Sequence, residues 1–372
     1  MKNRKTLCYG IAAILCLGLC ACFSPLDYKG SQGTISLTLP GEGSAARAAV
    51  SPPNWHYELK FSGPDGTAIP KTAKAGETVS LRVEPGVWSV SVIALRPFFS
   101  TDTNQTEYYE VADGSDTINV KPGIKNLVEI PMAITDPNYV KEYLNAQKDG
   151  DSAANPVRLP LNTILYDDFA WGNICSQIGV SKKFVDLDLT RCQEVIGGAL
   201  DAGVFDPRKI GSIYSDAPDG MAYIVRLTLP DEATSIADAT GTITFADFSN
   251  LQHVNTGKKV TIIGMQAFSN LTRLTSVTFG EYVDEIGTSA FAGCKLTSVT
   301  IPASVTSIGD FAFDSNPLTT VIFMGDEVTF NLPGSVFPGG ISPNTLGELY
   351  SGSHGGAGTY TRPPGGNYWT KQ

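Results

Sequence analysis

Apolar and polar residues alternate in short runs between residues 33 and 134. The clearest runs are Ile35-Ser36-Leu37-Thr38-Leu39 and Trp88-Ser89-Val90-Ser91-Val92, in which every second side chain is apolar or aromatic. Alternation with a period of two predicts strands that bury one face and expose the other. Turns such as Pro64-Asp65-Gly66 separate the runs, because Pro presets φ and Gly allows positive φ.

The same region predicts two packed sheets. About seven short strands in about 100 residues are typical of an immunoglobulin-like or transthyretin-like β-sandwich. The stretch from Leu81 to Val92 is similar to a hairpin of such domains, in which a Pro-Gly turn precedes a strand with a buried aromatic residue. We therefore expect Trp88 to fill the core and not to stack on a ligand.

A longer period governs the second half of the chain. Three sets of apolar residues recur at intervals of 22, namely Leu274, Leu296 and Leu318; Val277, Val299 and Val321; and Phe279, Ile301 and Phe323. Ile-Gly and Ala-Phe pairs follow in the copies that begin at Leu274 and Leu296. A further copy begins at Leu251, and eroded copies begin at Leu227 and Leu187, the last continued by Ile196-Gly197. Units of this size cannot bury their own apolar residues, so they must stack into a solenoid with a shared interior.

The regular copies resemble the repeats of BspA-like leucine-rich-repeat surface proteins of bacteria. The stretch Leu296-Thr-Ser-Val-Thr-Ile-Pro-Ala-Ser-Val-Thr-Ser-Ile-Gly-Asp-Phe-Ala-Phe matches the family pattern nearly throughout, and Cys294 stands where the family's Cys closes a unit. The resemblance implies a leucine-rich-repeat solenoid over residues 161–330, with eroded N-terminal turns and regular turns from about residue 251. We expect Phe291 and Phe313 to be core residues of neighbouring turns.

The N-terminus predicts an export signal. A basic start precedes an apolar run that is too short for a membrane-spanning helix and ends at Leu19-Cys20-Ala21-Cys22. This ending resembles the lipobox of bacterial lipoproteins, in which a Cys takes a diacylglycerol and becomes the new N-terminus. The resemblance implies a signal peptide over residues 1–21 and lipidation of Cys22. Cys20 is the other candidate for lipidation, but Leu19 directly before it fits badly at a position that takes a small residue. The alternative to a lipoprotein is an ordinary secretory leader.

The remaining segments divide the chain as follows. Residues 22–32 are expected to be a tether, residues 33–134 the sandwich, and residues 135–160 a polar linker with a short helix. Residues 331–372 are rich in Gly and Pro. Tyr360 and Trp369 flank a Pro-Pro-Gly-Gly turn there, which predicts a hairpin that caps the solenoid. A flexible tail is the alternative.

Composition narrows the classes of partner. The chain has 27 Lys and Arg against 37 Asp and Glu, a net charge of −10. A general nucleic-acid binder needs a basic surface, so this charge opposes nucleic acid as a partner. The hydrophobic fraction of 42% is sufficient for a core, so the chain as a whole is not expected to be disordered.

No residue pattern indicates catalysis. His56, His253 and His354 are isolated in the sequence, and no Gly-x-Ser-x-Gly, phosphate-binding Gly loop or His-Glu-x-x-His motif occurs. Metal sites need several ligands in suitable spacing. We therefore expect no enzymatic activity, no cofactor and no metal site.

Three cysteines remain beyond the leader and the expected lipidation site Cys22. Cys175, Cys192 and Cys294 lack metal-ligand spacing, and their odd number allows at most one disulfide. We expect them to act as small buried apolar residues.

The exposed face of the solenoid sheet offers the candidate binding residues. In the regular copies, the positions that alternate away from the core carry small hydroxyls, at Thr275, Ser276, Thr278, Thr297, Ser298 and Thr300. The earlier copies are more varied, with Asp186, Asp188, Arg226, Thr228, Gln252, His253 and Asn255 at comparable positions. If one region distinguishes partners, we expect it at that end. A solvated sheet without a ligand is the alternative, because Thr is a common solvent-facing strand residue.

Taken together, these features predict a mainly β, non-enzymatic lipoprotein exported to the outer membrane or cell surface. By resemblance to the BspA-like proteins it would adhere to host extracellular-matrix proteins or to surface proteins of other bacteria. It would contact the membrane through the N-terminal lipid. The alternative is a periplasm-facing structural or assembly lipoprotein without an adhesive role.

Overall fold

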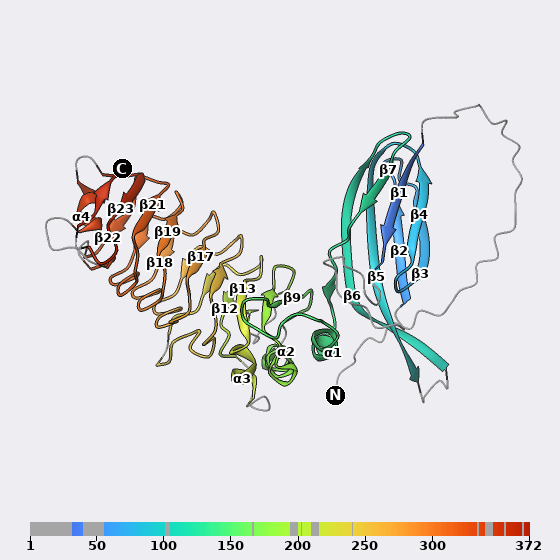
Figure 1. Ribbon diagram of the computed structural model, residues 1–372, viewed down its shortest axis with the longest axis horizontal. Helices are drawn as coiled ribbons and strands as arrows, with labels where there is room; N and C mark the ends of the chain where they lie inside the picture. Colours follow the sequence, from blue (N-terminus) through green and yellow to red (C-terminus); the bar gives the residue numbers. More distant parts are fainter. Residues whose placement is uncertain are drawn as a thin grey trace, which may run out of the picture. The chain divides into compact units, whose positions relative to one another are not determined.

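The computed structural model describes most of the chain. The described residues are 32–39, 56–100, 105–165, 167–193, 200–201, 203–209, 216–239, 241–332, 335–338, 345–352, 355–366 and 368–372. The chain divides into two compact units, Met1–Met132 and Ala133–Gln372. Strands predominate over helices in the described residues, which confirms a mainly β fold (Figure 1). The predicted signal peptide and Cys22 lie outside the described residues.

Two sheets build the first unit. One contains, in order, β4 (Thr78–Val83), β1 (Gly33–Thr38) and β7 (Lys125–Val128). Within this unit the other sheet contains, in order, β3 (Ala68–Lys74), β2 (His56–Ser62), β5 (Gly86–Ser100) and β6 (Gln105–Val120). Neighbouring strands are antiparallel except β1 and β7, which are parallel.

The core of the first unit follows the alternation in the sequence. Ile35 and Leu37 on β1, and Val90 and Val92 on β5, are at most 3% exposed. Trp88 is also buried, and its indole Nε1 donates a hydrogen bond to the Glu84 carbonyl at 2.9 Å. The prediction that Trp88 is a core residue is therefore confirmed.

Residues 135–160, predicted to be a linker, instead begin the stack of the second unit. The elements from Ala133 to Pro160 are β8 (Ala133–Ile134), η1 (Pro137–Tyr139), α1 (Val140–Asn145) and β9 (Val157–Pro160). Tyr139, Val140 and Leu144 are buried, and β9 pairs in parallel with β10 (Val185–Asp188). The segment is ordered because its apolar residues cover the first turn and supply the first strand.

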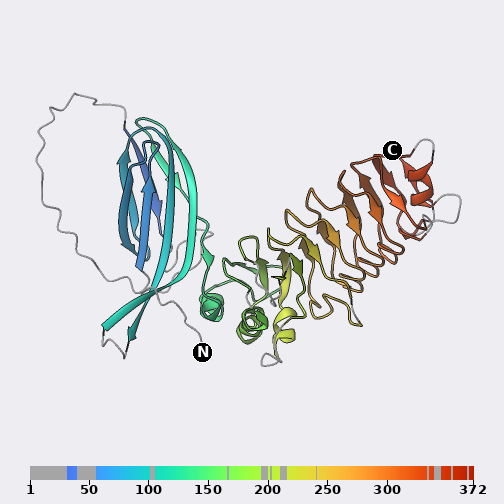
Figure 2. The same ribbon diagram turned by 180° about the vertical axis from the view of Figure 1, so that it is seen from behind.

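The repeat copies form parallel sheets, which is the predicted solenoid (Figures 1 and 2). The first repeat sheet contains, in order, β17 (Ser276–Thr278), β15 (His253–Asn255), β13 (Ile224–Thr228), β10 and β9. The second contains, in order, β11 (Leu200–Asp201), β12 (Val204–Phe205), β14 (Ser235–Ile236), β16 (Ile262–Ile263), β18 (Glu285–Ile286), β20 (Ser307–Ile308) and β22 (Thr329–Phe330). Every neighbouring pair in them is parallel except β11 and β12. The helices of this unit are completed by α2 (Asp167–Ser181), α3 (Ala217–Met221) and α4 (Leu346–Ser351).

A column of phenylalanines fills the interior of the solenoid. Phe268, Phe291, Phe313 and Phe337 stack in succession, with ring centroids 5.1, 5.5 and 5.3 Å apart and interplanar angles of 11°, 5° and 2°. Phe291 and Phe313 are completely buried, which confirms that they are core residues of neighbouring turns. The rings of Phe291 and Phe313 therefore each contact an aromatic ring of the turn before and of the turn after.

The copy that begins at Leu187 differs from the prediction. Ile196-Gly197 lie outside the described residues. The strand that pairs with Ser235–Ile236 of the next copy is Val204–Phe205, and Phe205 lies opposite Ile236. Additional residues separate the two strands of this copy, and a fixed period along the chain does not reveal such an insertion.

The three cysteines are buried, as predicted, and they are free. Cys175, Cys192 and Cys294 form no disulfide with one another. The Cys294 thiol donates to the Phe268 carbonyl of the preceding turn at 3.1 Å. In the next copy Asn316 has the same role, because its Nδ2 donates to the Phe291 carbonyl at 2.7 Å. In these two copies the residue at the same position thus donates a hydrogen bond to a buried carbonyl of the preceding turn.

A hairpin covers the C-terminal end of the solenoid. A separate sheet contains, in order, β19 (Ser298–Ile301), β21 (Thr320–Phe323), β23 (Gly358–Thr361) and β24 (Thr370–Lys371). Strand β23 is antiparallel to both of its neighbours. Tyr360 and Trp369 are buried, and the rings of Tyr350 and Tyr360 lie 4.3 and 5.6 Å from that of Phe323. The hairpin and α4 therefore shield the interior of the last turn from water.

Candidate functional site

Strand alternation determines which side chains lie on the exposed face of the first repeat sheet. Leu227 on β13 and Val254 on β15 point to the interior and are 1% and 2% exposed. Their neighbours in sequence point the other way, so Arg226 is exposed and His253 and Asn255 are half-buried. The exposed face therefore consists of the side chains that alternate along each strand with the buried apolar ones.

The C-terminal part of this face is uncharged. The predicted hydroxyl positions, Thr275, Ser276, Thr278, Thr297, Ser298 and Thr300, are all exposed or half-buried. The last three lie on or directly before β19, which begins the following sheet and contacts β17. Some of these hydroxyls already have partners, because Thr275 Oγ1 donates to the Gln252 carbonyl at 3.2 Å. Hydroxyl rows of this kind present hydrogen-bonding groups without a net charge.

The N-terminal part of the face carries a column of titratable side chains. Arg158 on β9, Asp186 on β10, Arg226 on β13 and His253 on β15 are in register on successive strands, and we call these four residues the charged column. Neighbouring strands lie about 4.8 Å apart, so these side chains are adjacent. The position after His253 is Ser276, where the hydroxyl rows begin.

Asp188 neutralises one end of the charged column. Its Oδ2 lies 3.0 Å from Arg158 Nη2. Its Oδ1 accepts hydrogen bonds from the backbone N–H and the hydroxyl of Thr190, at 3.1 and 2.8 Å. Both carboxylate oxygens of Asp188 are thus engaged within the chain.

The two titratable groups inside the column have shifted pKa values. Burial raises the pKa of Asp186, although Arg226 and Arg158 act in the opposite direction. Burial, reinforced by Arg226, lowers the pKa of His253, while Asp186 acts to raise it. His253 is therefore mostly neutral at pH 7 and can donate one hydrogen bond and accept another.

Arg226 is the available cation of this face. Among the described residues, the ion pairs are Arg158–Asp188, Lys183–Asp151, Arg208–Asp206, Lys258–Asp231 and Lys259–Glu232. Arg226 is in none of them, and the strand beside it carries His253 and Asn255, which have no negative charge. Its guanidinium keeps its hydrogen-bond donors available for a group outside the chain.

The structure brings most of the predicted face residues together and adds one. Arg226, Thr228, His253 and Asn255 lie on adjacent strands, and Gln252 directly precedes β15. Arg158 was not predicted, because β9 lies in the segment expected to be a linker. The run Val157-Arg158-Leu159-Pro160 has the same alternation as the strands of the repeat copies, and that signal could have revealed it.

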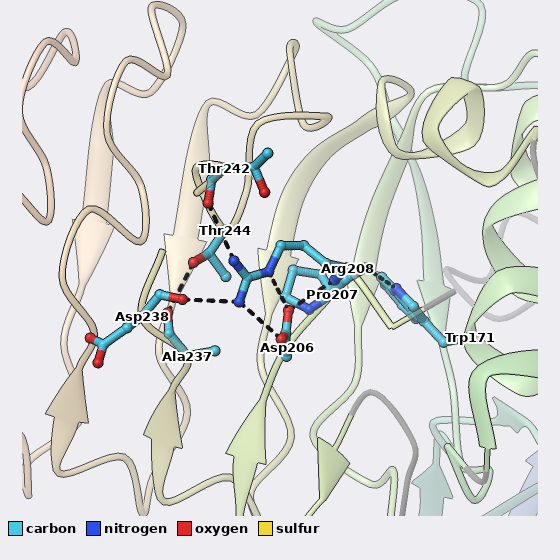
Figure 3. Close-up of polar contacts among 8 residues, drawn as sticks. All are labelled: Trp171, Asp206, Pro207, Arg208, Ala237, Asp238, Thr242 and Thr244. Carbon is cyan, nitrogen blue, oxygen red and sulfur yellow. Dashed lines mark hydrogen bonds and ion pairs between the residues drawn. The ribbon is translucent and has the colours of Figure 1, made fainter. Parts of the chain in front are cut away.

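A second polar cluster is structural (Figure 3). Arg208 Nε and Nη2 donate to Asp206 Oδ1 and Oδ2 at 2.8 and 3.0 Å. The same guanidinium donates to the carbonyls of Asp238 and Thr242 in the next turn, at 2.9 and 3.2 Å. Burial alone would raise the pKa of Asp206, but the hydrogen bonds from Arg208 lower it. This arginine holds two turns together and its donors are used within the chain.

A metal site needs several ligating side chains close together, and a membrane span needs a long apolar helix. Within the described residues, no group of three His, Cys, Asp or Glu side chains could hold a metal ion. No helix in the described part of the chain is both long and apolar enough to cross a membrane. Of the three histidines, His354 lies outside the described residues.

Comparison with known proteins identifies the repeats. A family model described as BspA type leucine rich repeat region matches residues 238–332 in six copies. A leucine-rich repeat protein from Bacteroides ovatus is 29% identical, with 30% of this chain and 28% of that chain covered and a TM-score of 0.26. A leucine-rich repeat protein from Bacteroides thetaiotaomicron is 10% identical, with 81% of this chain and 54% of that chain covered and a TM-score of 0.19. No curated protein matches the chain. The matched part is thus less than two thirds of either structural neighbour.

Proposed function

Because residues 238–332 are a BspA-type leucine-rich repeat region, we propose that the chain is a non-enzymatic protein-binding module of the bacterial cell surface. The observation that carries the proposal is the exposed face of the first repeat sheet, with the charged column at one end and, at the other, hydroxyl rows that continue onto the adjacent strand β19. A solenoid offers such a face as an extended binding surface. The partners we propose are host extracellular-matrix proteins or surface proteins of other bacteria.

The residue types on this face favour a protein over a sugar. Sugar rings stack on Trp or Tyr, and the face positions of β9, β10, β13, β15 and β17 carry neither. Arginine, histidine and hydroxyl side chains instead suit the charged and polar groups of a protein surface.

Adding bulk and charge to the hydroxyl rows tests the proposal. Thr278→Lys combined with Thr300→Lys is expected to reduce binding of the chain to immobilised fibronectin, laminin or intact bacteria by about 10-fold or more, because charge and bulk prevent close contact. The matched control is Ser307→Lys with Thr329→Lys on the second repeat sheet, which should bind as the parent does. Binding can be measured by biolayer interferometry and cell-adherence counts. Equal loss in both variants would contradict a role for this face.

We further propose that the chain is held at the outer membrane by a lipid on Cys22. Cys22→Ala is expected to move the protein from the membrane fraction to the soluble fraction, because acylation provides about 0.8 kcal/mol per buried CH₂. Cell fractionation with immunoblotting measures this, and Cys20→Ala serves as the control that should remain with the membrane. Protein that stays with the membrane after Cys22→Ala would contradict the anchor.

Protease treatment of intact cells distinguishes the proposed surface location from the periplasm-facing alternative. Loss of the repeat unit, with a periplasmic protein protected, supports adhesion. Protection of the repeat unit would instead favour the structural or assembly role.

The first unit is proposed to be an immunoglobulin-like or transthyretin-like sandwich that acts as a spacer between the anchor and the repeats. Its support is the pair of sheets β4-β1-β7 and β3-β2-β5-β6 with a core that includes Trp88. No binding role is assigned to it.

A further inference from the structure

We propose that the charged column is the specificity-determining part of the binding face and that Arg226 anchors a carboxylate side chain from an acidic segment of a protein partner. The proposal rests on the proposed function of this face and names the chemistry of its partner. It gives Arg158, Asp186 and Asp188 a part in determining what can bind.

Of the two arginines in the charged column, Arg158 is in an ion pair of the described residues and Arg226 is not. Arg158 and Arg226 are both exposed, but Arg158 lies 3.0 Å from the Asp188 carboxylate. Arg226 takes part in none of the ion pairs among the described residues. A guanidinium that binds a carboxylate through two parallel hydrogen bonds provides both affinity and a defined orientation.

The flanking strands give the site a direction. On the β10 side of Arg226 lie Asp186 and Asp188, which repel a second carboxylate. On the β15 side lie His253 and Asn255, which offer hydrogen-bond donors without negative charge. A partner carboxylate is therefore expected to sit over Arg226 and His253 and away from β10.

Asp186 acts as a selectivity element because it lies between two arginines. It is in register with Arg158 on one side and Arg226 on the other, and both arginines stabilise its charged form. Its negative charge beside Arg226 weakens the attraction of any anion that approaches. A partner must therefore bring a carboxylate with the correct placement, which opposes nonspecific binding of anions.

A model acidic peptide tests this assignment on the full chain. Tetraglutamate is titrated against the protein, with tetraglutamine as the uncharged probe, and the imidazole signals are followed by NMR. The chain has only three histidines, so the signal of His253 can be assigned by substitution. Tetraglutamate is expected to shift the His253 signal and to raise the pKa of His253, because a nearby carboxylate stabilises the imidazolium ion. Tetraglutamine should do neither.

Three variants identify the residues responsible. Arg226→Gln is expected to weaken tetraglutamate binding by about 10-fold, the usual effect of removing a charge-assisted pair. Arg273→Gln, an exposed arginine in the turn before β17, is the matched control and should bind as the parent does. Asp186→Asn is expected to strengthen binding, because it removes the competing carboxylate. A merely structural role of Asp186 would not increase affinity.

The outcomes separate this proposal from the proposed function. The proposal that Arg226 binds a carboxylate is overturned if Arg226→Gln binds tetraglutamate as tightly as the parent does. It is also overturned if Arg273→Gln loses as much affinity for tetraglutamate as Arg226→Gln. Tighter binding of oligogalacturonate than of tetraglutamate would overturn the assignment to a protein partner. If instead tetraglutamate binds at Arg226 while the Thr278→Lys and Thr300→Lys variant still adheres to matrix proteins and cells, the carboxylate site stands and the proposed function of the hydroxyl rows fails.

Discussion

Replacing Phe313 with Ala is expected to lower the free energy of unfolding of the repeat unit by about 3–5 kcal/mol. The Phe313 ring is completely buried between Phe291 and Phe337, with centroids 5.5 and 5.3 Å away. Its removal leaves a cavity in the middle of the column, and the backbones of the stacked turns cannot collapse into it because their strand ladders hold the spacing. Urea denaturation followed by circular dichroism, with Trp369 fluorescence as a reporter of the cap, measures the loss.

A second phenylalanine in the same turn provides the control. Phe311 is 47% exposed and has a φ of 60°, where L side chains are strained. Phe311→Ala should change the free energy of unfolding by less than about 0.5 kcal/mol, because little burial is lost. If Phe311→Ala and Phe313→Ala cost the same, the phenylalanine column is not a main source of stability.

Asn316→Leu is expected to destabilise the repeat unit by about 2–4 kcal/mol, although leucine has nearly the same size. The Asn316 Nδ2 donates to the Phe291 and Phe313 carbonyls at 2.7 and 3.0 Å, and its Oδ1 accepts from the Leu296 N–H at 3.0 Å. Leucine leaves these buried backbone groups without partners. The same denaturation experiment measures the change.

Asn316→Cys distinguishes lost hydrogen bonds from lost packing. Cys294 occupies the equivalent position one copy earlier and donates to the Phe268 carbonyl. A cysteine at residue 316 can restore the bond to Phe291 but not the bond from the Leu296 N–H, so it should cost less than leucine. A leucine variant at least as stable as the cysteine variant would show that these hydrogen bonds contribute little.

The repeat region was predictable because its information is local and repeated. Leu274, Leu296 and Leu318 recur at one interval, so each copy independently specifies the same strand and the same inward face. The burial of Phe291 and Phe313 followed from the position of the Ala-Phe pair in that period. The hydroxyl rows followed as well, because alternation within a strand places every second residue on the exposed side.

Irregular copies were less predictable, because insertions change the spacing without changing the stacking. The strand that pairs with Ser235–Ile236 is Val204–Phe205, and only the register between neighbouring turns reveals this. Strand β9 was missed for the same reason, since its partner β10 is separated from it by a loop and a helix that have no counterpart in the regular copies.

The sequence by itself determined the mainly β character, the period of the solenoid, its interior and its hydroxyl rows, since each depends on residues close together in the chain. The tertiary structure alone decided the pairing of Arg158 with Asp188, the alignment of Asp186, Arg226 and His253, and the place of Arg226 outside the ion pairs of the described residues. These features join residues that are far apart in sequence. Charges act through distance in space, and that distance depends on the lengths and paths of the intervening loops.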